Sequence, residues 1–157
     1  MSITITKNFD LGKIHFDLHK ELNLAGGIVM KDIADNVKNG TDIKGGTLQP
    51  LKKATIKAKS AKGSPHPSRA LFDTGRMAGK GSVKGVGGRG VHITDRATKS
   101  KQQVTLSTAQ DRKDIGGYHN EGGGNLPKRE WFGISKKAEE KAFKMMRMRV
   151  DQIIDNA

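Results

Sequence analysis

From residue 118 to residue 134 the chain reads Tyr-His-Asn-Glu-Gly-Gly-Gly-Asn-Leu-Pro-Lys-Arg-Glu-Trp-Phe-Gly-Ile. This stretch holds the single Trp, the single Tyr and one of the five Phe of a protein that is only 4% aromatic. Because large aromatic side chains dominate burial, we expect Trp131 and Phe132 to anchor the core. The glycine run and Pro127 predict a turn that places both side chains beside a C-terminal helix.

The composition favours one domain with a thin core. The chain has 157 residues, which suffice for a single domain, but only 34% of them are apolar and large apolar side chains are scarce. We therefore expect a single domain over residues 1–157, with a flexible N-terminal arm (1–15) and flexible loops at 39–50, 61–68 and 79–102.

The net charge of +13 predicts attraction to polyanions or to an acidic protein surface. The absence of cysteine fits a reducing compartment and excludes thiolate catalysis and disulfide bonds. The first residues lack the basic and apolar regions of a signal peptide, and no apolar run approaches the ~18 residues of a membrane span. These features predict a soluble protein that is made inside the cell.

The N-terminal half alternates between two periodicities. Ile3 and Ile5 alternate with polar residues, which predicts a short strand or arm. Apolar residues then recur at helical spacing, which predicts one helix from about Asp17 to Lys38, ended by Gly40. The pair Gly26-Gly27 lies within this helix and predicts a kink or a close contact there.

Two basic segments follow. Residues 52–59 predict a short basic helix, whose charges either form a solvated face or bind phosphate. The glycine-rich run 81–90 lacks the Gly-Lys-Ser/Thr ending of a phosphate-binding loop, so it predicts a hairpin tip. Residues 91–94 and 103–108 predict an antiparallel hairpin that another element must cover. The residues expected to contact DNA or a partner are Lys52, Lys53, Lys57, Lys84, Arg89, Arg96, Lys99 and Lys101.

The C-terminal half predicts a loop over 109–117, a short strand over Tyr118–Glu121 and, after the glycine turn, an amphipathic helix capped by Ser135. The fold class expected is therefore α+β. It combines an N-terminal helix, a small antiparallel β-sheet with a long basic hairpin, and a C-terminal amphipathic helix.

Three patterns resemble sites of chemistry. In a strand, His119 and Glu121 would share one face, which resembles the general base and metal ligand of a nuclease, but no second acidic cluster completes a two-metal site. His15 and His19 have a spacing that could hold a metal on a helix, although two exposed histidines explain it as well. Residues 73–75 read Asp-Thr-Gly, which favours a capped turn over an aspartic protease. We expect no enzymatic activity, metal or cofactor, and a packing and hydrogen-bonding role for His119 beside Tyr118.

Four segments in order resemble motifs of the virion morphogenesis or tail completion family of tailed bacteriophages. They are Leu-Gln-Pro-Leu ending at residue 51, the Leu-Phe-Asp-Thr-Gly-Arg-Met of 71–77, the Tyr-His-Asn-Glu-Gly of 118–122 and the Leu-Pro-Lys-Arg-Glu-Trp-Phe-Gly-Ile of 126–134. The resemblance covers roughly residues 45 to 155. The residues that carry it are Leu51, Thr55, Leu71, Thr74, Gly75, Tyr118, His119, Gly122, Pro127, Arg129, Trp131 and Phe132.

The resemblance implies a structural, non-enzymatic protein of the virion, assembled in the host cytoplasm. It would form a ring of its own copies, most often six and in some cases twelve, that completes the tail and joins it to the head. Its partners would be neighbouring neck and tail proteins and the phosphate backbone of packaged DNA, with no membrane. The alternative is a basic nucleic-acid-binding protein without sequence specificity, which the lack of aromatic residues among the basic ones disfavours.

Overall fold

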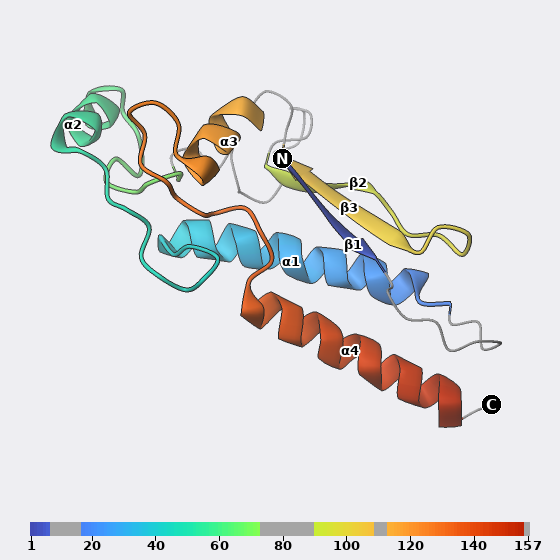
Figure 1. Ribbon diagram of the computed structural model, residues 1–157. Helices are drawn as coiled ribbons and strands as arrows, with labels where there is room; N and C mark the ends of the chain where they lie inside the picture. The colour runs from blue at the N-terminus through green and yellow to red at the C-terminus, as the bar shows by residue number, and fades with distance from the viewer. Residues whose placement is uncertain (7–16, 73–89, 109–112, 156–157) are drawn as a thin grey trace.

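The computed structural model describes residues 1–6, 17–72, 90–108 and 113–155. These residues form a mixed α+β fold, as expected (Figure 1). The elements in chain order are β1 (Ser2–Thr6), α1 (His19–Asn39), α2 (Lys53–Ala61), β2 (Val91–Asp95), β3 (Gln103–Thr108), α3 (Lys113–Glu121) and α4 (Lys136–Asp155). The N-terminal helix, the short basic helix, the hairpin and the C-terminal helix are all confirmed.

The sheet is antiparallel with the order β1-β3-β2, so the hairpin β2–β3 gains the N-terminal strand as its third member. Ile3 stands opposite Leu106 and Ile5 opposite Val104 in the register of β1 and β3. The strand interpretation of residues 2–6 is thus confirmed. Strand β2 confirms the hairpin strand expected from residues 91–94, although it lies within the range 79–102 that was also expected to be a flexible loop. Its first residue, Val91, is buried in the core together with residues of α1.

Helix α1 is the middle layer of the molecule. It contacts all three strands on one side and α4 on the other, and Figure 1 shows α4 running alongside it. Every third or fourth residue of α1 is buried, which is the pattern of a helix whose apolar stripe faces a core. The core that α1 shares with the sheet contains Leu22, Val29, Ile33, Val37, Val91, Val104 and Leu106.

The expected close contact in α1 is made at Gly26. A Cβ atom added to Gly26 would lie 2.7 Å from Cγ1 of Val104 in β3, whereas one added to Gly27 would have nothing within 4 Å. A separation under 3 Å is a clash, and Val104 is fully buried, so its side chain has no free space to move into. Gly26 therefore sets how closely α1 approaches the sheet.

We predict that Gly26→Ala lowers the free energy of unfolding by about 1–2 kcal/mol, since overpacking a core outweighs the gain in helix propensity. The matched control is Gly27→Ala, which should raise it by about 0.5–1 kcal/mol because only the propensity changes. Chemical denaturation of the two variants measures both effects. Equal stabilisation by the two alanines would contradict the close contact.

The segment before the glycine turn is a helix, and the expected loop over 109–117 and strand over Tyr118–Glu121 are wrong where the structure describes them. Helix α3 spans Lys113–Glu121. The pair Gly116-Gly117 disfavours a helix by ~1 kcal/mol per residue, so local propensity alone does not indicate one here. In the fold, a Cβ at Gly116 would lie 3.0 Å from Cζ2 of Trp131, and the indole Nε1 donates a 3.1 Å hydrogen bond to the carbonyl of Gly116. Burial of the indole therefore outweighs local propensity.

Trp131 and Phe132 are buried, as predicted, and their rings meet edge to face with centroids 5.6 Å apart. Their backbone N–H groups both donate to Oδ1 of Asn120 in α3, at 3.0 and 3.1 Å. The turn continues to Ser135, whose Oγ accepts the N–H of Ala138 at 3.1 Å and so caps α4 as expected. The segment therefore joins α3, the core and α4.

Candidate functional site

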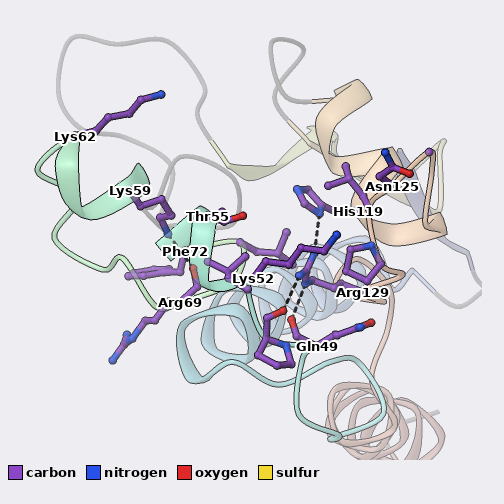
Figure 2. A pocket seen from close by; sticks show the side chains of 16 residues that line it. Gln49, Lys52, Thr55, Lys59, Lys62, Arg69, Phe72, His119, Asn125 and Arg129 are labelled. Carbon is purple, nitrogen blue, oxygen red and sulfur yellow. Dashed lines mark hydrogen bonds between the residues drawn. The ribbon is translucent and has the colours of Figure 1, made fainter. Parts of the chain in front are cut away.

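A groove of about 960 Å³ opens between α2 and the segment that follows α3 (Figure 2). Lys52, Thr55 and Lys59 come from the α2 side, and His119, Asn125 and Arg129 from the other. No Asp or Glu is found among the described residues that line it. We call this the basic groove. Its lining residues are Gln49, Pro50, Leu51, Lys52, Thr55, Lys59, Lys62, Arg69, Leu71, Phe72, His119, Gly124, Asn125, Leu126, Pro127 and Arg129.

Arg129 lies at the base of the basic groove and is only 4% exposed. Its guanidinium donates from Nε to the carbonyl of Gln49 at 2.8 Å and from Nη2 to the carbonyl of Pro50 at 3.3 Å. Nη1 donates to Nδ1 of His119 at 3.3 Å. No carboxylate of a described residue pairs with this buried cation, and burial lowers the pKa of Arg129. One N–H on each terminal nitrogen has no acceptor among the described residues.

His119 is held by Arg129 through both backbone and side chain. The carbonyl of His119 accepts the backbone N–H of Arg129 at 2.7 Å. Because a guanidinium can only donate, Nδ1 of His119 accepts and the neutral ring carries its proton on Nε2. Burial, and then the charge of Arg129, lower the pKa of His119 below its usual 6.5. The expected hydrogen-bonding role is confirmed, but the side-chain partner is Arg129, while Tyr118 is largely exposed.

This lowered pKa predicts a pH dependence. The unfolded chain protonates His119 near pH 6.5 and the folded chain only at lower pH, so the unfolded state binds more protons between these values. The free energy of unfolding should therefore be intact above pH 6.5 and fall as the pH is lowered towards the pKa of the folded state.

Denaturation curves measured between about pH 7.5 and 5.5 would check this, because this range spans the usual histidine pKa. His119→Gln keeps an acceptor for Arg129 and removes the titration, so its stability should change less over this range. The carboxyls of Asp17 and Glu130, with pKa values lowered to about 2, titrate at more acid pH. An unchanged slope in the variant would show that another group is responsible.

Two cations of the basic groove have structural bonds. Nζ of Lys59 donates to the carbonyls of His66 and Arg69, at 2.9 and 3.0 Å, and thereby closes the loop after α2. Nη1 of Arg69 donates to the carbonyl of Lys38 at 3.1 Å, at the end of α1, and its guanidinium carbon lies 5.7 Å from the ring centroid of Phe72. These contacts fix the α2 side of the groove against α1.

Two further cations of the basic groove lack such structural bonds. The ammonium groups of Lys52 and Lys62 are exposed and have no ion pair or hydrogen bond to any described residue. Together with the unused N–H groups of Arg129, they leave the groove with uncompensated positive charge. The arrangement can bind a negatively charged group.

The structure gathers half of the family-motif residues in this one place. The motif residues that line the basic groove are Leu51, Thr55, Leu71, His119, Pro127 and Arg129. Trp131 and Phe132 lie in the core, Gly122 ends α3, and Tyr118 lies outside the groove lining. Thr74 and Gly75 lie outside the described residues.

The expected DNA- or partner-contacting residues do not form one surface. Lys52 lines the groove, while Lys53 and Lys57 are exposed elsewhere on α2. Arg96 and Lys99 are exposed in the β2–β3 turn, which Figure 1 shows at the opposite end of the molecule from α2. Lys101 forms an ion pair with Asp95. Lys84 and Arg89 lie outside the described residues.

The shared face expected for His119 and Glu121 is wrong, because residues two apart on a helix do not face each other. His119 is half-buried against Arg129, and Glu121 is exposed.

Of the histidine pair expected to be able to hold a metal, His19 bonds to the carboxylate of Asp17, and His15 is outside the described residues. Across 1–6, 17–72, 90–108 and 113–155, no three His, Cys, Asp or Glu side chains are grouped to hold a metal. In the same ranges no helix is long and apolar enough to cross a membrane.

Sequence reasoning missed several residues of the site. Arg69, Phe72 and Lys62 reach the groove only because the chain folds back after α2, and no local pattern signals this. No sequence pattern marked Asn120 either, since its side chain accepts a hydrogen bond from the backbone of Trp131, 11 residues later. Asn125 and Leu126 follow the glycine run, which could have marked them.

Comparison of the chain with models of protein families, with curated proteins and with solved structures finds no match.

Proposed function

We propose that this protein is a structural component of a bacteriophage virion, which forms a ring at the neck or the head-proximal end of the tail and joins tail to head. The proposal rests on the resemblance of four ordered segments and on one observation, the incomplete burial of α4. The exposed side chains of α4 support association with further copies of the chain.

Helix α4 has 20 residues, of which Ala138 and Ala142 are buried and Met145, Met146, Val150 and Ile153 are partly buried. Phe143, Met148 and Ile154 are 61%, 57% and 52% exposed. An amphipathic helix usually covers its large apolar side chains and leaves small or polar ones outside. Met146 packs against the core, so α4 covers part of its apolar surface within the chain, while these three large side chains are left in solvent, where a neighbouring subunit can cover them.

The sheet offers a second route to association. Strand β3 is central, and β1 and β2 each pair on one side only among the described strands. An outer edge presents backbone N–H and C=O groups to which another chain can add a strand. Both features support an assembly in which each copy completes the packing of the next.

We predict that light scattering of the purified protein gives a mass near six or twelve subunits. Phe143→Lys should lower this mass, because a charge in place of the exposed Phe143 ring opposes its burial by a neighbour, while circular dichroism stays unchanged. Ser60→Lys, which adds the same charge to the exposed face of α2, is the control and should leave the mass unaltered. A ring that persists unchanged in Phe143→Lys would contradict the role of α4.

The second candidate is a nucleic-acid-binding protein, and α2 is the feature that favours it. This helix has no buried residue and carries Lys53 and Lys57 on its exposed surface. Phosphate contacts would make DNA affinity fall steeply with salt, and Lys53→Glu with Lys57→Glu would reduce both the affinity and its salt slope. A monomeric mass together with tight DNA binding at low salt would favour this candidate over the ring.

A further inference from the structure

The basic groove combines positive charge with an apolar lining, and this combination restricts its occupant. Lys52 and Lys62 are unpaired among the described residues, and Arg129 is a buried cation in the same lining, near Lys52 in Figure 2. The same groove is lined by Leu51 and Leu126, the latter 43% exposed. A matching ligand carries carboxylates and an apolar side chain close together.

A DNA duplex matches this groove poorly. Its phosphates would satisfy the lysines, but the backbone has no apolar group to cover the leucines and prolines of the lining. An acidic protein segment can do both.

The last turns of α4 have this chemistry. Asp151, Ile154 and Asp155 stand at positions i, i+3 and i+4, so they share one face of the helix. All three are exposed, and neither carboxylate has an ion pair with a described residue. The last turn of α4 has no basic residue, and the negative end of the helix dipole adds to its negative potential.

The two surfaces lie at opposite ends of the molecule. Figure 1 shows α2, which forms one side of the groove, at the upper left and the C-terminal end of α4 at the lower right. They cannot meet within one chain. A contact between two different surfaces of identical subunits is head-to-tail, and such contacts form a ring when the rotation between subunits closes and an open filament when it does not.

We propose that the acidic end of α4 in one subunit docks in the basic groove of the next. The carboxylates of Asp151 and Asp155 pair with Lys52, Lys62 and the unused N–H groups of Arg129, and Ile154 covers the apolar lining. This inference rests on the proposed ring, whose subunit interface it identifies.

Cross-linking tests the contact directly, since the chain has no cysteine and only engineered thiols can react. Ile154→Cys is mixed with Asn125→Cys, which places a thiol in the groove, and a short bis-maleimide is added. We expect cross-linked dimers from this mixture and far fewer from Ile154→Cys mixed with Thr98→Cys in the β2–β3 turn. Equal yields in the two mixtures would overturn the contact.

Charge reversal tests its energetics. Asp151→Lys with Asp155→Lys, or Lys52→Glu with Lys62→Glu, should raise the concentration for half-assembly by about tenfold or more, which corresponds to ~1.4 kcal/mol. The protein with all four substitutions should assemble again, because the charges match once more. Glu139→Lys with Glu140→Lys is the control on the same helix and should change little. Failure of the fourfold variant to recover, in a protein whose wild type forms rings, would overturn the contact and leave the ring intact.

The two proposals can fail separately. A wild-type mass of one subunit at all concentrations would count against the ring, while the cross-linking mixtures still decide the contact. If Lys52→Glu with Lys62→Glu weakened only DNA binding, and the Asn125 thiol formed no specific cross-link, the groove would be a nucleic-acid site and the docking proposal would be wrong.

Discussion

Trp131→Ala is expected to lower the free energy of unfolding by about 3–5 kcal/mol, the largest effect of any single substitution proposed for this chain. Trp131 is fully buried and is the largest side chain in a core of small and medium residues. Its removal leaves a cavity beside Gly116 and Phe132, since the fully buried neighbours cannot collapse into it. The indole hydrogen bond to the carbonyl of Gly116 is lost as well.

Thermal or chemical denaturation followed by circular dichroism measures this effect. Tyr118→Ala is the matched control, because it removes an aromatic ring that is 58% exposed and should cost less than about 1 kcal/mol. Trp131→Phe should lower the free energy of unfolding by an amount between those of Trp131→Ala and Tyr118→Ala. A Trp131→Ala protein that unfolds at the wild-type midpoint would show that the indole is not the anchor of the core.

Arg129→Ala is expected to lower the free energy of unfolding by about 2–4 kcal/mol, the second largest effect. The guanidinium joins its own segment to two others, through the carbonyls of Gln49 and Pro50 and through Nδ1 of His119. Truncation leaves these acceptors without their donor inside a partly closed groove. Removing the buried charge offsets part of the loss, because desolvating a cation is itself costly.

Arg129→Lys distinguishes the charge from the geometry. Lysine keeps the positive charge but cannot donate from three nitrogens in one plane, so we expect it to recover little of the lost stability. Arg149→Ala is the control, since Arg149 is exposed and its ion pair with Glu21 should be worth less than about 1 kcal/mol. Equal stability of Arg129→Ala and Arg149→Ala would contradict the bracing role of Arg129.

Most elements of the fold could be predicted from the sequence because their periodicity is local. Apolar residues at helical spacing predicted α1 and α4, and the alternation in residues 91–94 and 103–108 predicted β2 and β3. Helix α3 could not be predicted. Its two glycines favour other conformations, and the compensating contact with Trp131 comes from 15 residues away.

The features of the candidate site likewise divide into those that the sequence could predict and those that depend on the tertiary structure. The sequence by itself determined the abundance of positive charge, the scarcity of large apolar residues and the motif positions, because composition and short spacings need no knowledge of the fold. Only the tertiary structure decided that Leu51, His119 and Arg129 meet in one groove, with Arg69 and Phe72 beside them. It also placed the basic β2–β3 turn and the acidic end of α4 away from this groove (Figure 1). Such placements depend on contacts between residues tens of positions apart, such as the bond from Arg129 to Gln49, and no local pattern encodes them.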